Sequence, residues 1–303
     1  MIQARFDGGD APTLVLSGTG PRPRAVELAG SRARTSARLT GRGKTWRAVL
    51  PLTASRWGGP VLPIPSGEYR VEITPAADAQ DAQEAAPIED LPLTQLGGLR
   101  AHLTGGLMTA GPPIDPAYDS GEGQDALERR YATRPGGLEN AVFFESFYGR
   151  NVSCNPLAID RELARRAPRV TRYWSVVDLS VPVPDGAVPV VEGSPEWWRA
   201  RGHSRLLVIN DWLRRRFVRE RGQIVLQTWH GTPLKRLALH RPGFDPRRMA
   251  AVLKESRRWN VLLAWNPYAA KVLGKAYAFL TRPMWVEGYP RNDVLVHGDD
   301  GAT

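Results

Sequence analysis

The sequence predicts a small all-β, sandwich-like domain followed by a larger α/β domain with a parallel sheet. Over residues 1–76, short apolar runs with partial alternation are separated by closely spaced Gly and Pro turns, as in a small sandwich. After about residue 140, compact apolar runs alternate with segments of helical periodicity, which is typical of buried parallel strands between helices. A chain of 303 residues is long enough for two such domains.

The sandwich-like domain is expected over residues 1–76. Its predicted strands share short length, β-favouring residues and a flanking turn: Thr13–Gly18, Arg24–Gly30, Thr35–Gly41, Thr45–Leu52 and Glu68–Thr74. The Ala- and Pro-rich stretch that follows has little to bury, and the signal stays weak up to residue 139. We therefore expect residues 77–139 to form a linker and an irregular segment, with one short helix near Asp125–Tyr131.

The α/β domain is expected over residues 140–303. Its predicted strands are apolar runs: Ala141–Ser146, Arg172–Leu179, Ala187–Gly193, Arg205–Asn210, Gln223–Trp229, Asn260–Trp265 and Pro283–Gly288. Helical spacing follows Asn155, and Ser194 with Pro195 predicts a helix start with its N-cap. In a parallel sheet of this kind, the ligand site lies at the carboxyl ends of the strands.

His230 stands where one of these strands should end, in the sequence His-Gly-Thr-Pro-Leu. Gly231 permits a tight turn, and Pro233 suits the first turn of a helix, whose N-terminus would attract anions. A neutral imidazole at this edge could act as a general base toward an attacking hydroxyl. The alternative is a capping or core histidine in an ordinary loop.

The charge balance favours anionic partners, since 41 Lys and Arg residues against 31 Asp and Glu residues give a net charge of +10. Nucleic acid, an anionic membrane face and a phosphate-rich polymer all fit, but no nucleic-acid-binding motif is present, so we expect no nucleic-acid partner. Cys154 is the only cysteine, which excludes an intrachain disulfide, and we expect neither a metal nor a cofactor. No run approaches the roughly 18 apolar residues of a membrane span, so a cytoplasmic or peripheral location is expected.

An arginine-rich stretch, Asn210–Gly222, offers two readings. Its arginines share one short segment around Trp212 and Phe217: Arg214, Arg215, Arg216, Arg219 and Arg221. They could form the solvated face of a helix, or an electrostatic landing surface for an anionic membrane.

Three motifs resemble one known family. Gln227–Leu237 (QTWHGTPLKRL), Asn140–Ile159 (NAVFFESFYGRNVSCNPLAI) and Glu287–Asp293 (EGYPRND) are similar, in order and spacing, to the CDP-glycerol glycerophosphotransferases. Those enzymes build teichoic-acid-type polymers of glycerol or ribitol phosphate. The resemblance covers about half of the chain and implies a GT-B fold, in which two Rossmann-like halves face each other across a cleft.

The resemblance also implies roles for particular residues. His230 would be the catalytic base in the acceptor-side half, and Arg291, Asn292 and Asp293 would mark the hinge to a second half that binds the donor, CDP-glycerol. Five further motif residues would bind substrate: Glu145, Ser146, Arg150, Thr232 and Lys235. For Glu145, the alternative is a structural carboxylate of the loop. Because the sequence ends at Thr303, soon after the expected hinge, we expect this chain to hold the acceptor-side half without the donor-binding half.

The expected reaction is transfer of glycerol phosphate from CDP-glycerol to a hydroxyl of a lipid-linked or polymeric glycerol phosphate acceptor, with release of CMP. Such an enzyme would work at the inner face of the cell membrane. Whether this chain alone is an enzyme stays open, since half of the site is expected elsewhere. The alternative is a non-catalytic basic module that binds an anionic polymer or membrane surface.

Overall fold

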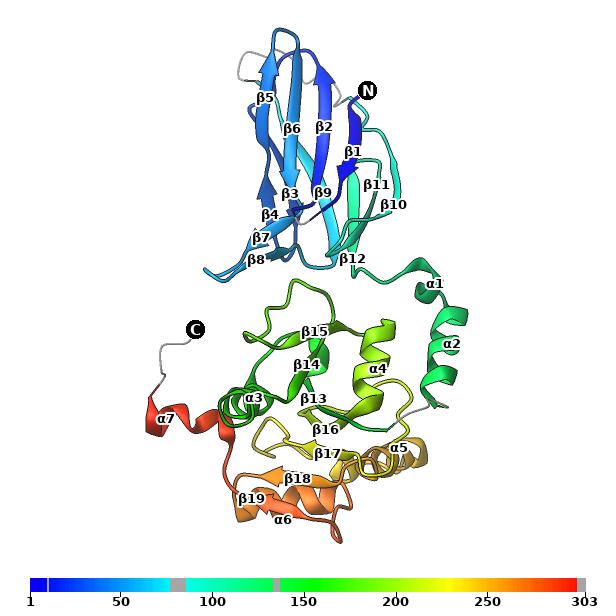
Figure 1. Cartoon of the computed structure of the whole chain (residues 1–303), viewed down its shortest axis with the longest axis vertical. Helices are drawn as coiled ribbons and strands as arrows, with labels where there is room; N and C mark the ends of the chain where they lie inside the picture. The colour runs from blue at the N-terminus through cyan, green and yellow to red at the C-terminus, as the bar shows by residue number, and fades with distance from the viewer. Residues whose placement is uncertain (10, 77–85, 133–136, 299–303) are drawn as a thin grey trace. The chain divides into compact units, whose positions relative to one another are not determined.

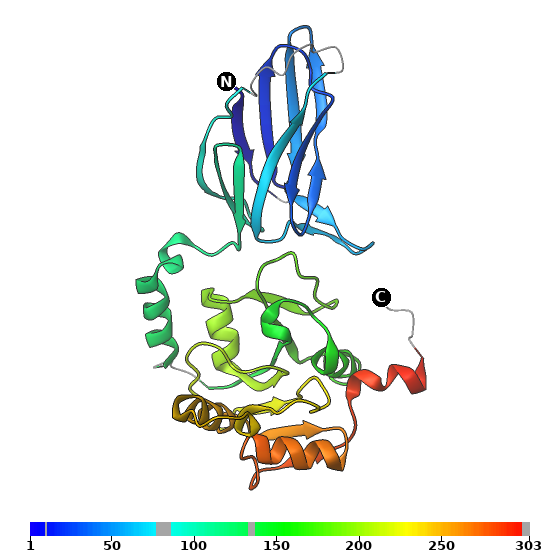
Figure 2. The same ribbon diagram turned by 180° about the vertical axis from the view of Figure 1, so that it is seen from behind.

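The structure is a computed structural model that describes residues 1–9, 11–76, 86–132 and 137–298 (Figure 1). It divides into two compact units. The first comprises Met1–Asp115 and Asp178–Pro182, and the second comprises Pro116–Val177 and Val183–Thr303. Figures 1 and 2 show the first unit as strands alone and the second as a sheet with helices packed against it.

The first unit is built from two antiparallel sheets. The four-stranded sheet has the order β1 (Gln3–Asp7), β2 (Thr13–Thr19), β6 (Thr45–Pro51), β5 (Arg38–Arg42). The six-stranded sheet has the order β10 (Leu91–Gln95), β11 (Arg100–Thr104), β12 (Leu107–Gly111), β9 (Gly67–Thr74), β3 (Ala25–Gly30), β4 (Arg34–Ser36). A small hairpin pairs β7 (Thr53–Ser55) with β8 (Val61–Pro63).

Both sheets contribute to a single hydrophobic core, as in a sandwich. Leu14 and Leu50 from the first sheet and Leu28 and Leu103 from the second are all fully buried in it. The prediction of an all-β N-terminal domain is therefore confirmed, although its expected end was too early.

The expectation of a linker and irregular segment over residues 77–139 was wrong for much of its length. Strands β10, β11 and β12 complete the six-stranded sheet, so the β unit continues to Asp115. Strand β10 was not predicted from the sequence because it contains Pro92 and its side chains are mostly exposed. The short helix expected near Asp125–Tyr131 is present as α2 (Gly121–Ala132), after α1 (Pro116–Asp119), while residues 77–85 and 133–136 lie outside the described residues.

The second unit contains a seven-stranded sheet that is parallel throughout. Its strands, in spatial order, are β15 (Val188–Val191), β14 (Thr171–Val176), β13 (Glu139–Glu145), β16 (Ser204–Ile209), β17 (Ile224–Gln227), β18 (Val261–Ala264) and β19 (Met284–Val286). The parallel sheet predicted from the apolar runs is confirmed, and each predicted run overlaps one strand.

Helices cover both faces of this sheet. The helices are α3 (Cys154–Arg166), α4 (Pro195–His203), α5 (Pro246–Ser256), α6 (Pro267–Ala276) and the short α7 (Val294–His297), with 3₁₀ turns at Phe147–Gly149, Ala238–His240 and Pro290–Asn292. Helices α2, α4, α5 and α6 pack with one set of strand side chains, and α3 packs with the opposite set. This two-faced burial explains why the strands are continuously apolar instead of alternating.

Three helices start in the same way, with a capping residue followed by proline. The side chains of Ser194, Asp245 and Asn266 each accept a hydrogen bond from the backbone N–H three residues later. Such caps satisfy a free N–H of the first turn, and the next residue, proline, has none to satisfy. The start predicted at Ser194 and Pro195 is confirmed.

Two predicted helical features are absent from the described residues. Arg214–Arg221 has no helical turn, and no helix starts at Pro233, since only the 3₁₀ turn Ala238–His240 follows it. The turn that contains His230 therefore does not lead directly into a helix. Within the described residues, no helix is both long and apolar enough to span a bilayer.

Candidate active site

The carboxyl ends of three adjacent strands meet at one edge of the parallel sheet. Ser146 follows β13, Asn210 and Asp211 follow β16, and His230 comes three residues after the end of β17. Because β13, β16 and β17 are neighbours in the sheet, their loops are brought together although they are far apart in sequence. His230 thus lies at the edge where the sequence placed it.

The imidazole of His230 lies between aromatic rings and a carboxylate. Its ring stacks on Trp229, with centroids 5.1 Å apart and an interplanar angle of 17°, and lies 5.3 Å from the ring of Phe147. Its Nε2 is 3.6 Å from Oδ1 of Asp211, and its side chain is 33% exposed. The histidine is therefore open to solvent and to a ligand, and it faces a negative charge.

Asp211 is a candidate site residue that the sequence analysis did not identify. Its backbone carbonyl accepts a hydrogen bond from Nε2 of Gln227, the last residue of β17, at 3.0 Å. Burial, followed by the negative charge of Asp211, raises the pKa of Tyr148. Asp211 therefore lies among His230, Gln227 and Tyr148, where its carboxylate can stabilise a protonated imidazole. An available signal was the position of Asp211 directly after an apolar run that ends at Asn210.

The loops around His230 hold residues with left-handed backbone geometry. Phe147, Tyr148, Cys154 and Trp229 have φ angles of 47°, 57°, 64° and 53°. A residue with a side chain pays on the order of 1–3 kcal/mol for such a conformation, and such residues cluster at functional sites. One support is the carboxamide of Asn210, whose Oδ1 accepts the backbone N–H of Phe147 at 2.9 Å.

Asn155 and the Glu287–Asp293 segment fix the backbone of the histidine loop. Nδ2 of Asn155 donates to the carbonyl oxygens of Thr228 and Trp229, at 3.2 and 3.1 Å. Nη1 of Arg291 donates to the carbonyl oxygen of His230 at 3.1 Å, and the backbone N–H of Arg291 donates to Oδ1 of Asn155 at 3.3 Å. Arg291, expected at a hinge, thus contacts the histidine loop directly.

The other two residues expected at the hinge follow Arg291 on the surface. Asn292 ends the 3₁₀ turn Pro290–Asn292, and Asp293 comes just before α7; both are exposed. Close to this turn, the hydroxyl of Tyr289 donates to the carbonyl oxygen of Gly231 at 3.3 Å. The turn therefore packs against the histidine loop through Tyr289 and Arg291.

Glu145 and Ser146 support the loop after β13 from within. Glu145 is 4% exposed, its carboxylate accepts a hydrogen bond from Oγ of Ser175 at 2.7 Å, and burial raises its pKa. Ser146 is fully buried, and its Oγ donates to the carbonyl oxygen of Asn151 at 2.6 Å. The hydrogen bonds of both side chains are internal, whereas substrate binding would need them to face solvent.

Arg150, Thr232 and Lys235 are exposed. Lys235 lines a hollow of about 340 Å³ in the second unit. Arg236, Arg241, Arg248, Trp212 and Tyr277 also line this hollow. Its cationic rim over aromatic rings is suited to a ligand that carries phosphate. In the part of the chain that the structure describes, no group of three or more His, Cys, Asp or Glu side chains could hold a metal ion.

The fold and this edge define a class: an α/β protein with a parallel sheet and an exposed histidine beside a carboxylate at its carboxyl edge. A family model described as CDP-Glycerol:Poly(glycerophosphate) glycerophosphotransferase matches residues 130–302. The chain belongs to this family.

Curated relatives agree with the family. The teichoic acid poly(glycerol phosphate) polymerase of Bacillus subtilis (strain 168) is 36% identical over 167 residues, which are 52% of this chain and 22% of the relative. The teichoic acid glycerol-phosphate transferase of Staphylococcus aureus (strain NCTC 8325 / PS 47) is 30% identical over 178 residues, or 52% of this chain and 43% of the relative. The chain thus spans less than half the length of these relatives.

Solved structures of the wall teichoic acid polymerase TagF are similar in fold to part of this chain. One covers 58% of this chain and 46% of its own, with a TM-score of 0.54 and 29% sequence identity. Another, of a variant soaked with CDPG, covers 57% of this chain and 44% of its own, with a TM-score of 0.54 and 28% identity.

Proposed function

We propose that the second unit is the acceptor-side, Rossmann-like half of a GT-B glycerophosphotransferase that uses CDP-glycerol as its donor. The observation that carries this proposal is the position of His230, 33% exposed and 3.6 Å from Asp211, at the carboxyl edge of the sheet. Family membership and the likeness to a polymerase that was soaked with CDPG support it. The donor would bind to a second half that follows the segment around Asp293.

In the proposed reaction, His230 takes the proton of an acceptor hydroxyl while its oxygen attacks the β-phosphorus of CDP-glycerol. A new P–O bond joins the acceptor to glycerol phosphate, and the bond from that phosphorus to CMP breaks, releasing CMP. Nε2 of His230 faces Asp211, so Nδ1 is the nitrogen that receives the proton. Asp211 then stabilises the positive charge that forms on the ring.

The acceptor is proposed to be a chain of glycerol phosphate, either lipid-linked or polymeric. Lys235 and Arg236 lie five and six residues after His230 in sequence, and they line the cationic hollow with Arg241. Phosphates of the acceptor would bind there, which would orient a terminal hydroxyl toward His230.

The test uses a polypeptide that carries both halves, because this chain spans less than half of its relatives. General-base catalysis contributes about 10²–10⁴ in rate, so His230→Ala should lower turnover by about that factor and leave CDP-glycerol affinity nearly unchanged. Incorporation of radiolabelled glycerol phosphate into a lipid-linked acceptor measures turnover. Full activity of the variant would refute the proposal, as would robust transfer by the 303-residue chain alone.

A second candidate function is a basic module that binds an anionic polymer or membrane surface without catalysis. The loop after His230 favours it, since Leu234 and Phe244 are 83% and 85% exposed and stand in sequence among cationic residues. The two functions are separable, because only the first requires His230. We place the protein at the inner face of the cell membrane in either case.

A further inference from the structure

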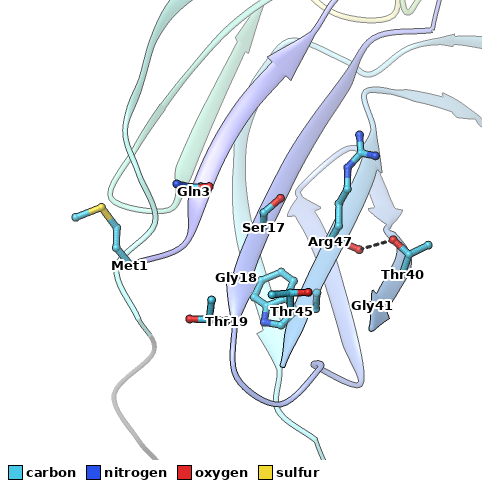
Figure 3. Close-up of a pocket in the computed structure, with 10 residues that line it drawn as sticks. Met1, Gln3, Ser17, Gly18, Thr19, Thr40, Gly41, Thr45 and Arg47 are labelled. Atoms are coloured by element: carbon cyan, nitrogen blue, oxygen red, sulfur yellow. Dashed lines mark hydrogen bonds between the residues drawn. The ribbon is translucent and has the colours of Figure 1, made fainter. Parts of the chain in front are cut away.

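A second polar hollow, of about 440 Å³, opens on the four-stranded sheet of the first unit (Figure 3). Its polar lining comes from all four strands: Gln3 from β1, Ser17 and Thr19 from β2, Thr45 and Arg47 from β6, and Thr40 from β5. Nothing in the proposed transfer reaction uses these residues.

The strand registers place these side chains on the outer face of the sheet. Gln3 pairs with Ser17, Ser17 with Arg47, and Arg47 with Thr40, which makes one row across the four strands. The next row along the sheet contains Thr19, Thr45 and Arg42. Alternate residues of β6, namely Trp46, Ala48 and Leu50, are buried in the core, so both rows face outward.

Three arginines of this face have free charges. Arg38, Arg42 and Arg47 are exposed, and none forms an ion pair with another described residue, whereas the nearby Arg5 pairs with Asp7 at 3.0 Å. Arg38 and Arg42 share one face of β5, and four residues of a strand span about 13 Å. Guanidinium groups at this spacing can contact different phosphates along one extended chain.

The hydroxyls of this face are prepared to accept hydrogen bonds. Oγ1 of Thr45 donates to the carbonyl oxygen of Arg42 at 3.1 Å, and Oγ1 of Thr40 donates to that of Arg47 at 3.5 Å, the dashed line of Figure 3. With its proton used in this way, each hydroxyl oxygen offers its lone pairs to a ligand. A ligand rich in hydroxyl groups would supply the missing donors.

The hollow has no aromatic platform. Trp46 lines it but is only 6% exposed, because its ring covers Gly18, where any side chain would overlap the ring. Single-stranded nucleic acids depend on stacking of bases against exposed aromatic rings, which this face does not provide. This face must therefore recognise a ligand through the phosphates and hydroxyl groups of that ligand.

We propose that the outer face of the four-stranded sheet binds a polyol phosphodiester chain, with phosphates on Arg38, Arg42 and Arg47 and polyol hydroxyls on the threonines. We assign the ligand to an extended polymer and not to a lipid headgroup, because the cationic residues extend over a length greater than one headgroup. The choice of glycerol phosphate as the repeating unit rests on the proposed function. The assignment of a binding site to this face does not, because it is argued from the arginines and threonines of the sheet.

The test measures binding of a fluorescent, soluble glycerol phosphate oligomer to the full chain by anisotropy. Arg42→Gln with Arg47→Gln should weaken binding at least tenfold, since both lose a phosphate contact. Thr40→Val with Thr45→Val should weaken binding of the oligomer about threefold or more, a loss of roughly 0.6 kcal/mol or more, and leave binding of inorganic polyphosphate unchanged. Hydrogen exchange should slow across residues 38–47 when the oligomer is added.

The matched control is Arg24→Gln with Arg70→Gln, which removes the same charge from exposed positions beside and in the six-stranded sheet. An equal loss in this control would mean general electrostatic attraction and would overturn the proposal. Unchanged hydrogen exchange at residues 38–47 on addition of the oligomer would also overturn the proposal. The same holds if the threonine variants bind the oligomer as the wild type does, or if the arginine variants bind it normally and lose only their binding to phosphatidylglycerol vesicles. Hydrogen exchange at residues 38–47 tests polymer binding by the first unit, whereas transfer by His230 variants tests the proposed function of the second unit. Failure of one proposal can therefore be distinguished from failure of the other.

Discussion

A single carboxylate distinguishes His230 from an ordinary loop histidine. Asp211 Oδ1 lies 3.6 Å from Nε2 of His230, which is longer than a hydrogen bond, so the pair interacts through charge and orientation. The ring is also held by stacking on Trp229. If His230 is the base, the carboxylate of Asp211 should stabilise the imidazole ring most strongly once the ring has taken the proton of the acceptor hydroxyl.

Asp211→Asn is therefore expected to lower kcat at least tenfold, with little change in KM for CDP-glycerol, in a polypeptide that carries both halves. The asparagine keeps the size of the side chain and removes only its charge. Asp185→Asn, an exposed aspartate of the same unit, is the control and should behave as the wild type. A change in KM alone would show that Asp211 binds substrate and does not assist His230.

Glu145 should make stability depend on pH in an unusual direction. Burial raises its folded pKa above the ordinary 4.5, so between these two values the folded state binds more protons than the unfolded state. The wild type should then gain stability relative to Glu145→Gln as pH falls from the folded pKa toward 4.5, by up to about 1.4 kcal/mol per pH unit. Urea unfolding of both proteins at several pH values measures this difference, and a constant difference would contradict the assignment.

At the scale of elements, prediction succeeded where local sequence decides the outcome. The seven buried strands could be recognised from continuous apolar runs, and the start of α4 from Ser194 followed by Pro195. Strands β11 and β12 had a usable signal, since Gly105 and Gly106 both take positive φ angles in the two-residue turn that joins them. Strand β1 had none, because its residues are half exposed at the edge of a sheet.

A buried ion pair links helix α3 to strand β14. Oδ2 of Asp160, which is fully buried, is 2.8 Å from Nη1 of Arg172, which is 7% exposed. Replacing one partner of such a pair leaves an unpaired buried charge, so Asp160→Asn should lower the free energy of unfolding by about 3–5 kcal/mol. Glu162→Gln, on the same helix but with its ion pairs exposed to solvent, should lower the free energy of unfolding far less. Similar losses in the two variants on urea unfolding would refute this.

At the scale of the whole molecule, the site could be only half predicted. His230 was found from a strand-to-turn pattern, which is local. Its partner Asp211 depends on β16 lying next to β17, and strand order cannot be read from the runs themselves. Glu145 was correctly placed at a strand end, but its burial depends on Ser175 and Trp197, which come from other elements.

The arginine run that suggested a membrane landing surface is largely used inside the second unit. Arg214 and Arg215 pair with Glu192, and Arg216 lies 3.5 Å from Glu128. The loop after His230 is a better candidate surface, since Lys235, Arg236 and Arg241 are exposed and have no ion-pair partner among the described residues. Cations beside exposed apolar side chains are the combination that binds anionic bilayers.

Vesicles with anionic lipids should therefore retain the chain at low salt and release it as salt rises, because the attraction between exposed charges is screened. Replacing Lys235, Arg236 and Arg241 by Gln should weaken retention at least tenfold, at about 1 kcal/mol for each cation near the surface. The control replaces Arg165, Arg166 and Arg199 by Gln, three exposed arginines that each pair with a carboxylate. Both triple variants remove three charges, so equal losses in vesicle co-sedimentation would mean that net charge alone drives binding. If neutral vesicles retained the chain as well as anionic vesicles do, electrostatic attraction could not be the cause of binding.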